Sequence, residues 1–503
     1  MIGLPFLRLT ALFLAAGTAL LARTFTAVVY NVENLFDVDG VAVYDDYQPA
    51  RYTPAHLATK VAHIAAILKR YDDGRGPDLV LLNEIEIDRT PESAVADYAD
   101  FLTRLEGRTA AELLRQQPLP ADLAGLPAEA WLLKALHDAG LTGYTLVSGA
   151  DPAETHEDGN PRAIKNVILT RLPVKAVQSH PTLNARHVLE VELDVDGHRL
   201  HVFNNHWKSG ASDPATEPLR IANARTLRAR IDDLLKADAH ADILIGGDLN
   251  SQYNQKLRYR DMKTTAINDV LRSQGNELAL RGPQRDLYNL WHELPREQRG
   301  SDTWRGEWGT LMHLIVSRGL YDQRGVQYVD NSFSVGRFPD LNTDGAGLPR
   351  RWNGDTPQGS GFSDHFPIAA RFTIAEAGRT DRWIALARPS DRDETDAEPV
   401  RVSFAALEVE RTALTPDTLP AGARLRDGSF NGKIFRVVGP AEDGPLLRVT
   451  FAGESYEVYS PDPAIRDLLA AQRKETRGFR FYGELGTFRG RWQFVVRDAS
   501  WVK

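Results

Sequence analysis

The sequence predicts a mixed α and β fold with a smaller, all-β domain at its C-terminal end. Between residues 25 and 374, short runs rich in β-branched and apolar residues alternate with amphipathic segments of helical spacing. A polar and mostly acidic segment follows at residues 388–399, and beyond it the pattern changes to short strands separated by turns. The chain of 503 residues is long enough for two or three domains of ordinary size.

The elements of the main domain follow from the residue pattern. Residues 25–30 are β-branched and aromatic and predict a strand, and the apolar run at 78–84 predicts a buried strand that ends in polar residues. Helices are expected from Thr53-Pro54, where a cap residue precedes a first-turn proline, across much of 92–143 and at 217–235. Further strands are expected at 163–169, 187–195, 199–205, 243–248, 308–317 and 368–374.

The first 22 residues contain a single charge, Arg8, followed by fourteen uncharged residues. That run is shorter than the roughly 20 apolar residues of a membrane-spanning helix. It is typical of a secretory signal, with small residues at Ala19, Ala22 and Ala27 that permit cleavage. We therefore expect residues 1–23 to be a signal peptide and the mature protein to be secreted or periplasmic. The alternative is an uncleaved N-terminal anchor, and no stable membrane partner is expected after cleavage.

Composition limits the chemistry that the chain can perform. With 42% hydrophobic and 25% charged residues it is typical of globular proteins, which excludes disordered, collagen-like and coiled-coil chains. The absence of cysteine excludes disulfides, thiolate metal sites, iron–sulfur clusters and thiol nucleophiles. The net charge of -8 argues against a protein that coats nucleic acid by bulk electrostatics. An acidic chain can still act on phosphates where a metal or local basic groups offset the repulsion.

Five polar clusters stand at the ends of otherwise apolar predicted strands. They are Asn31-Val-Glu33-Asn34, Asn83-Glu84, Asn204-Asn205-His206-Trp207-Lys208, Gly247-Asp248-Leu249-Asn250 and Ser363-Asp364-His365. Alternate residues of a strand point the same way, and strand ends that converge on one edge are where sheet proteins form pockets. Taken singly, each cluster is more typical of a turn or a cap, and only the ordered set is specific. Its carboxylate and amide oxygens favour Mg²⁺, Mn²⁺ or Ca²⁺ over zinc, which leaves the two histidines for proton transfer or phosphate binding.

With these clusters in the same order, residues 25–375 resemble the metal-dependent endonuclease/exonuclease/phosphatase superfamily. Its members include pancreatic-type deoxyribonucleases, apurinic endonucleases, sphingomyelinases and inositol polyphosphate 5-phosphatases. The resemblance implies an α+β fold: a four-layer α/β-β/α sandwich in which two packed mixed sheets are flanked by helices. It also implies phosphoester hydrolysis with Mg²⁺, or else Mn²⁺ or Ca²⁺, as the cofactor. Residues 24–375 are then the catalytic domain.

The resemblance also implies a role for each cluster. Glu84 falls on the position of the principal metal-ligand glutamate, and the other implied metal ligands are Asn31, Glu33 and Asp364. The implied catalytic residues are His206 at the scissile phosphate, Asp248 to orient or deprotonate the nucleophile, Asn250 to bind phosphate, and His365 for proton transfer or charge stabilisation. The residues expected near the substrate phosphate are Asn205, Lys208 and, by a looser match, Arg162.

One position departs from the family pattern. The strand that resembles the family's L-D-H-I-L-V-S motif has Met312 in place of the aspartate that orients the catalytic histidine. A carboxylate fixes the imidazole tautomer and stabilises the imidazolium, and a thioether can do neither. Three explanations are open: another acid such as Glu86 or Asp302 substitutes, His365 acts without a partner, or the enzyme is impaired. We expect retained activity because the other motif positions are filled.

A second domain is expected at residues 400–503, after a linker at 376–399. Its predicted strands, with one helix at 463–474 between the third and the fourth, resemble an OB-fold. Residues 421–503 contain 14 Lys and Arg against 10 Asp and Glu, a net charge of +4, which leaves -12 for the remainder of a chain whose total is -8. Net charge of the whole chain is therefore a poor guide to its substrate.

Arginines and aromatic residues interleave near the end of this domain, namely Arg477, Phe479, Arg480, Phe481, Tyr482, Phe488, Arg489, Arg491 and Trp492. Aromatic rings can stack on bases while arginines meet the backbone, so the pattern is typical of single-stranded nucleic acid binding. The alternative is that the aromatic residues form the barrel core and the arginines its solvated face.

Together these observations predict a secreted or periplasmic, monomeric phosphodiesterase that depends on a divalent metal and acts as an endonuclease on DNA or RNA. A second enzymatic hypothesis is a phosphatase or phospholipase-type member that acts on inositol phosphates or sphingomyelin. A third is a binding protein with a degenerate site, for which Met312 is the indication.

Overall fold

The computed structural model describes residues 24–90, 95–276, 279–280, 282–375, 397–404, 409–420 and 422–503. The predicted signal peptide and residues 376–396 of the predicted linker lie outside the described residues. Within the part of the chain that the structure describes, none of the helices combines the length and the apolar character needed to cross a membrane.

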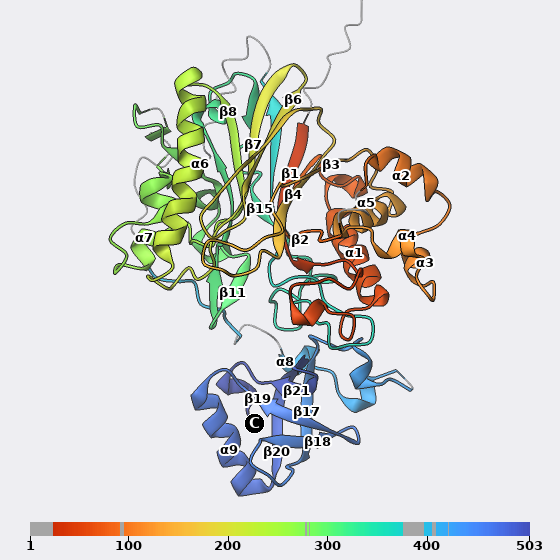
Figure 1. The fold of residues 1–503 in the computed structure, drawn as a ribbon. Coiled ribbons are helices and arrows are strands. Elements are labelled where there is room, and N and C mark those ends of the chain that lie inside the picture. The colour runs from red at the N-terminus through yellow and green to blue at the C-terminus, as the bar shows by residue number, and fades with distance from the viewer. Residues whose placement is uncertain are drawn as a thin grey trace, which may run out of the picture.

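Two mixed sheets form the centre of the first domain (Figure 1). The first sheet contains, in spatial order, β14 (Val326–Tyr328), β16 (Ile368–Ile374), β1 (Thr24–Leu35), β2 (Leu79–Glu86), β4 (Ile164–Thr170) and β3 (Thr145–Ser148), with β15 (Ser334–Val335) also paired to β16. The second contains β5 (Val174–His180), β6 (Val188–Val195), β7 (His198–His206), β8 (Asp242–Asp248), β13 (Met312–Val316), β10 (Leu287–Asn289) and β9 (Ser273–Gln274). The pairs β1–β2 and β7–β8 are parallel, and most other neighbours are antiparallel.

The strands are apolar on both faces because each sheet is covered on both sides. Val29 and Leu81 point into the core between the two sheets, where they join Leu244 and Leu314 of the second sheet. Their sequence neighbours point the other way, as alternate strand residues must, so Val28 belongs to the outer core of the first sheet. Because both faces of each sheet are buried, the sequences of the central strands are continuous apolar runs.

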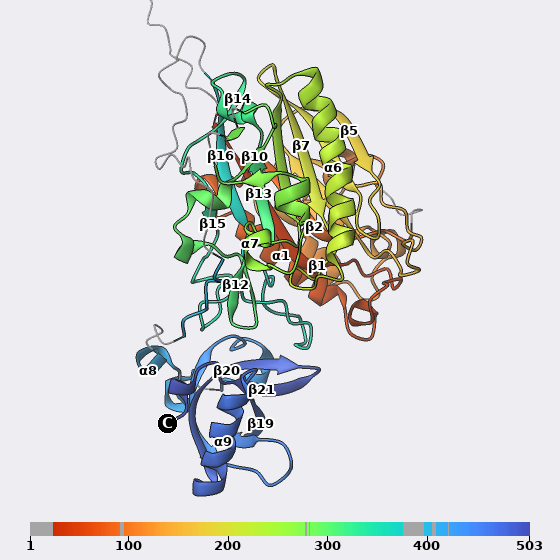
Figure 2. The same ribbon diagram turned by 90° about the vertical axis from the view of Figure 1, so that its left-hand side faces the viewer.

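Helices cover the outer face of each sheet and complete four layers (Figures 1 and 2). The first sheet is covered by α1 (Pro54–Leu68), α2 (Tyr98–Arg104), α3 (Ala110–Leu114), α4 (Ala121–Ala124) and α5 (Ala128–Asp138). The second sheet is covered by α6 (Glu217–Ala237), whose Leu227 and Ile231 pack on Phe203 and Ile245, and α7 (Gln255–Arg258) follows β8. The predicted four-layer α/β-β/α sandwich is confirmed.

One predicted break is confirmed and one predicted element differs in the structure. The described residues 95–143 contain four short helices, and Pro118 and Pro120, which the sequence indicates as a break in this helical segment, separate α3 from α4 because a proline cannot continue the helical hydrogen bonds. The strand predicted at 308–317 is two strands of different sheets. Its first part is β12 (Glu307–Gly309), which forms a hairpin with β11 (Asp302–Trp304), and its second part is β13.

A small β domain occupies the C-terminal end, as predicted. It contains α8 (Val409–Thr412), β17 (Ile434–Pro440), β18 (Arg448–Phe451), β19 (Glu454–Tyr459), α9 (Pro463–Thr476), β20 (Gly478–Phe488) and β21 (Arg491–Val495). The strands lie in the order β17-β20-β21-β19-β18, with β19 and β21 parallel. The helix α9 follows the third strand, as the sequence indicates.

The aromatic residues of this domain divide into two groups. Phe479, Phe481 and Tyr482 are buried in the domain core, so the alternative of a structural role is correct for these three. Phe488, at the turn between β20 and β21, is instead 53% exposed. Period-two alternation along β20 turns Phe479 and Phe481 inward and places Phe488, the last residue of the strand, on the opposite face.

Candidate active site

The ends of four central strands bring the predicted residues to one place. Since β1 and β2 are parallel, as are β7 and β8, the polar residues that follow their apolar parts emerge at the same edge of each sheet. Asn31 on β1 donates hydrogen bonds through Nδ2 to Glu84 Oε1 on β2 (2.9 Å) and to Asp248 Oδ2 on β8 (3.0 Å). These bonds join the two sheets at the centre of the candidate site.

A buried amide network holds the sheets in this register. Asn83 donates through Nδ2 to Asn166 Oδ1 (2.8 Å) and to Asn204 Oδ1 (3.0 Å). Its Oδ1 accepts the backbone N–H of Asp248 (3.0 Å). An unpaired buried amide is costly, so the paired network specifies where Asp248 lies. Asn166 was not predicted, because its role depends on which strands become neighbours.

Two residues predicted near the substrate phosphate have different surroundings. Asn205 is fully buried, donates through Nδ2 to the carbonyl of Gly246 (3.2 Å) and accepts the indole N–H of Trp207 (3.2 Å). Its side chain therefore supports the framework of the site. Lys208 is partly exposed, and its backbone N–H bonds to Asn223 Oδ1 on α6 (3.1 Å).

The glycines before Asp248 permit the close approach of neighbouring strands. A Cβ at Gly247, where φ is +118°, would overlap the carbonyl oxygen of Asn205 on β7. A Cβ at Gly246 would collide with the side chains of Leu81 and Val29 from the opposite sheet. Position 247 therefore requires glycine, and a side chain at position 246 would force Leu81 and Val29 to shift.

Several non-glycine residues of the predicted clusters have a left-handed backbone. The φ angles are 51° at Glu33, 62° at Asn34, 67° at Glu84 and 45° at Asn250. Such conformations cost roughly 1–3 kcal/mol each and concentrate at functional sites, where the surrounding structure enforces them. One effect is that the Asn34 backbone N–H donates to Glu84 Oε2 (3.0 Å).

Three carboxylates gather beside Asn31. Burial, and then the charge of Asp364, raise the pKa of Glu33 to about 7 and also raise the pKa of Glu84. Arg351 partly compensates, since its guanidinium donates to Glu33 Oε1 (3.0 Å) and lies 3.4 Å from Asp364 Oδ2. A divalent cation relieves this kind of repulsion between oxygen donors. These residues offer the oxygen donors of the metal site that the sequence predicts.

The two arginines near the predicted phosphate site have different positions. Arg186 was not predicted, and its Nη2 lies 2.5 Å from His206 Nε2. Burial, and then the charge of Arg186, lower the pKa of His206 well below its usual value. The predicted Arg162 donates to the carbonyl of Ala185 (3.2 Å), so it supports the segment that carries Arg186.

Asp248 lies between the two predicted histidines. Its Oδ2 is 3.9 Å from His206 Nε2 and 3.8 Å from His365 Nε2. Its Oδ1 accepts the backbone N–H of Asn250 (2.9 Å). The Asn250 side chain donates through Nδ2 to the carbonyl of Trp207 (3.2 Å). The structure therefore brings together all four residues that were predicted to be catalytic.

His365 is embedded among acids. Burial opposes its charged form, but the charges of Asp364, Asp302 and Asp248 outweigh burial and raise the pKa of His365 to about 9. Its Nε2 is 3.7 Å from Asp364 Oδ1. The backbone N–H of His365 bonds to Ser363 Oγ (3.1 Å), which fixes the start of the motif.

Of the two acids considered as substitutes for the missing family aspartate, Asp302 lies beside His365. The two residues form an isolated β-bridge, and Asp302 is buried. Glu86 instead accepts the backbone N–H of Asp37 (2.8 Å). Met312 is paired with Asp248 across β13 and β8, and its sulfur accepts the Asn31 backbone N–H at 3.2 Å.

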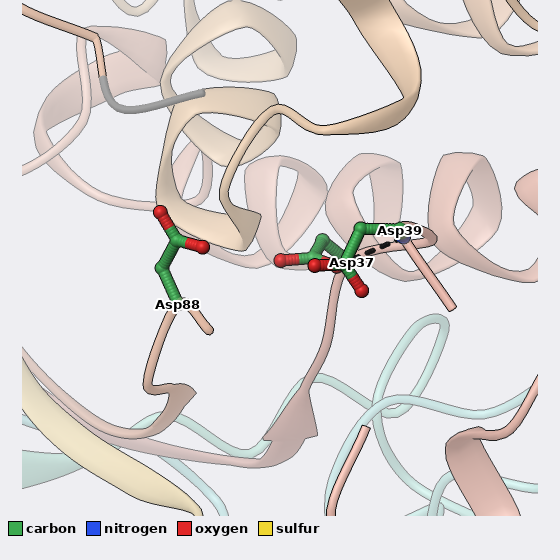
Figure 3. A group of neighbouring side chains, drawn as sticks. All are labelled: Asp37, Asp39 and Asp88. Atoms are coloured by element: carbon green, nitrogen blue, oxygen red, sulfur yellow. Dashed lines mark hydrogen bonds between the residues drawn. The ribbon is translucent and has the colours of Figure 1, made fainter. Parts of the chain in front are cut away.

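A second group of acids lies just beyond the ends of β1 and β2. Asp37, Asp39 and Asp88 each place a carboxylate oxygen within 4.8 Å of the others, and Figure 3 shows Asp88 facing the other two. Thr90 Oγ1 donates to Asp39 Oδ2 (2.8 Å) and to Asp88 Oδ1 (3.1 Å). These oxygens could also bind a divalent cation. No motif in the sequence predicts this group.

Comparisons with known proteins give a matching family model and similar solved structures. Residues 165–373 match the model of the Endonuclease/Exonuclease/phosphatase family, and no curated protein matches the chain. The chain is similar to truncated TDP2 of Caenorhabditis elegans at 14% identity, with a TM-score of 0.37 over 70% of this chain and 98% of that chain. It is similar to D. rerio TDP2 complexed with a single-strand DNA product at 13% identity, with a TM-score of 0.36 over 69% and 98%. An endonuclease/exonuclease/phosphatase family protein from Bacteroides thetaiotaomicron matches at 12% identity, with a TM-score of 0.37 over 70% and 99%.

Proposed function

We propose that this chain, which belongs to the endonuclease/exonuclease/phosphatase superfamily, is a divalent-metal-dependent phosphodiesterase. We propose nucleic acid as its substrate. Members of this superfamily are generally hydrolases of phosphoester bonds. The observation that carries the proposal is the junction of Asn31, Glu84 and Asp248 beside two buried histidines.

Glu84, Asn31, Glu33 and Asp364 would hold the cation. Their donor atoms are oxygens, which suits Mg²⁺, and Mg²⁺ needs only one or two carboxylates. When bound, the cation supplies positive charge that neutralises the phosphoryl oxygens during hydrolysis. Arg351, through its bonds to Glu33, would orient that carboxylate.

His206, Asn250 and Arg186 would bind the scissile phosphate. Because the pKa of His206 is lowered well below its usual value, its imidazole is neutral at neutral pH. A neutral Nε2 can accept an N–H from Arg186, which would hold the guanidinium toward the phosphate. Asp248 would orient the attacking water through the carboxylate that already accepts the Asn31 amide.

His365 would provide a proton or a positive charge. A pKa of about 9 keeps the imidazole protonated at neutral pH, which suits stabilisation of an anionic transition state. We propose that Asp302 takes the part of the missing family aspartate and positions this imidazolium. That role supports an active enzyme over a binding protein with a degenerate site.

Two features support nucleic acid as the substrate, and the signal-like N-terminus supports action outside the cell. Residues 421–503 carry a net charge of +4 in an otherwise acidic chain. The strand order of the C-terminal domain, with parallel β19 and β21 and a helix after β19, supports an OB-fold, a fold that binds oligonucleotides. We further propose that the mature protein is monomeric and is exported after removal of residues 1–23.

In the test, hydrolysis by the mature protein is measured on five substrates, each with Mg²⁺ and with chelator. The substrates are plasmid DNA, a single-stranded oligonucleotide, RNA, inositol phosphates and sphingomyelin. We expect chelator-sensitive cleavage of a nucleic acid. Exclusive hydrolysis of inositol phosphates or sphingomyelin would replace the proposed substrate class. Turnover of none of these substrates, together with binding of one, would support the degenerate-site alternative.

A further inference from the structure

We propose that two hairpin tips, Trp304 with Arg305 and Phe488 with Arg489, bind the unpaired bases and backbone of single-stranded nucleic acid on either side of the active site. The inference rests on the proposed function. It adds the strandedness of the substrate and two binding subsites that the catalytic motifs do not specify.

The first tip belongs to the hairpin of β11 and β12. Trp304 is 64% exposed, and the Arg305 guanidinium lies 5.6 Å from its ring centroid. Only one residue separates Trp304 from Asp302, which is bridged to His365. Two residue steps span at most about 7 Å, so this tip lies close to the His365 side of the centre.

The second tip belongs to the hairpin of β20 and β21 in the C-terminal domain. Phe488 is 53% exposed, and the Arg489 guanidinium lies 5.3 Å from its ring. This arrangement repeats that of Trp304 and Arg305. In each case an exposed aromatic ring is paired with a cation at a turn, which is the combination that stacks a base and meets a phosphate.

Hydrogen bonds attach the second hairpin to the catalytic domain next to the metal residues. Thr487 Oγ1 accepts a hydrogen bond from Asn353 Nδ2 (2.7 Å), and the backbone N–H of Gly490 donates to Asp355 Oδ2 (3.0 Å). Asn353 is two residues beyond Arg351, which contacts Glu33. The second tip is therefore held on the Glu33 side of the centre.

The placement of the two tips would allow one nucleic-acid strand to contact both of them. The hairpin of β11 and β12 extends toward the C-terminal domain in both views (Figures 1 and 2). A chain that contacts both tips would carry its backbone across the catalytic residues between His365 and Glu33. Stacking on both tips requires bases with free faces, which a single strand provides and an intact duplex does not.

The rings are not needed for the domain cores. The core of the C-terminal domain is made by residues such as Phe435, Phe481 and Phe494, and Phe488 is not among its buried members. Replacement of either exposed ring by alanine should therefore leave the fold intact while it removes a stacking surface. Loss of one such stack lowers affinity roughly 5- to 100-fold per base.

Binding is measured with the full mature chain carrying Glu84→Gln, so that no cleavage occurs, and a fluorescent single-stranded 12-mer. We expect Phe488→Ala and Trp304→Ala each to weaken binding roughly 5- to 100-fold, and Phe488→Trp to retain it. Val438→Ala and Val177→Ala are matched controls, because these side chains are 52% and 50% exposed on other strands. Arg489→Ala should reduce the slope of log affinity against log salt by about 0.7.

The ratio of kcat/KM for the 12-mer to kcat/KM for bis(p-nitrophenyl) phosphate is measured in parallel with Glu84 intact. We expect both alanine variants to lower this ratio. Unchanged 12-mer affinity, or equal losses in the valine controls, would overturn the inference even if the enzyme is a nuclease. Concentration-dependent dimerisation that is lost in Phe488→Ala would also overturn it, in favour of a protein interface. If the wild-type protein cleaves no phosphodiester, the proposed function fails, and the binding assay still decides the inference separately.

Discussion

Asp302 and His365 are paired in an isolated β-bridge, and the charge of the Asp302 carboxylate helps to raise the pKa of the His365 imidazole. Asp302 comes from the short β11–β12 hairpin, whereas the family aspartate is expected on the strand that here carries Met312. In the role proposed for it, Asp302 would supply this acid from a different element. The side chain of Asp302 fits because its neighbour is Gly309, where any Cβ would overlap the carboxylate.

This relationship predicts that Asp302→Asn lowers kcat roughly 10- to 1,000-fold, because the imidazolium loses its acidic neighbour. The pKa of His365 should fall, so the alkaline limb of the pH–rate profile should move to lower pH. Glu86→Gln is the comparison, since Glu86 bonds to Asp37 and should leave that limb in place. Met312→Asp should not accelerate the reaction, and a large rate increase in that variant would show instead that the natural site is impaired.

Glu84→Gln is predicted to stabilise the metal-free protein while it abolishes activity. Burial, and then the charges of Asp364 and Asp248, raise the pKa of the Glu84 carboxylate. Removal of its charge relieves that repulsion and should raise Tm in chelator by about 2–4 °C. Added Mg²⁺ should raise the Tm of the wild type but not of the variant, as thermal denaturation can measure. A lower Tm for the variant in chelator would contradict this account of the site.

Asp242 should make stability depend on pH. Burial raises its pKa to about 8, and the nearby Asp322 adds to the shift. A carboxyl group whose folded pKa is raised stabilises the fold below its unfolded pKa of about 4, and this contribution is lost as pH rises through about 8. Asp242→Asn should therefore become more stable relative to the wild type across pH 4–8, by roughly 2–5 kcal/mol.

Denaturant unfolding at several pH values measures this difference. Asp233→Asn, on the exposed side of α6, is the control and should follow the wild type. If the free energy of unfolding depended on pH in the same way in the wild type and in Asp242→Asn, the raised pKa of Asp242 would be ruled out as a source of the pH dependence.

Gly247→Ala is predicted to destabilise the protein by more than about 3 kcal/mol or to prevent folding, because its Cβ would overlap the Asn205 carbonyl at a positive φ. Gly354→Ala is the matched control. Its Cβ would make only an ordinary contact, at 3.8 Å from Trp352, and its φ is not in the left-handed region. Equal Tm values for the two variants would disprove the close-approach argument.

The strand-end residues could be predicted from the sequence because they depend on local patterns, whereas the four layers were implied by the family resemblance. Glu84 and Asp248 follow apolar strands, and parallel pairing of β1 with β2 and of β7 with β8 brings such ends together. Arg186 and Arg351 were missed because each reaches the site from a segment without a local signal. Arg351 lies 318 residues from its partner Glu33, so only the folded chain reveals the pair.

Asp302 was one of two acids that sequence reasoning left open, and tertiary structure distinguishes them. The interleaved arginines and aromatic residues of the C-terminal domain were compatible with nucleic-acid binding and with a barrel core, and only the folded chain shows which rings are buried. Alternation along β20 turns Phe479 and Phe481 inward, and Phe488, the last residue of that strand, lies on the opposite face and is exposed. A pattern of residue types therefore could not separate core positions from binding positions here.

Cleavage of a single-stranded oligonucleotide by the wild type and by Glu84→Gln, after chelation and then with increasing Mg²⁺, tests the central claim most directly. The account predicts no cleavage in chelator, recovery with Mg²⁺ in the wild type, and a loss of at least about 100-fold in kcat for the variant at every Mg²⁺ concentration. Cleavage that persists in chelator, or that is indifferent to Glu84→Gln, would contradict a metal-dependent centre built on Asn31, Glu84 and Asp248.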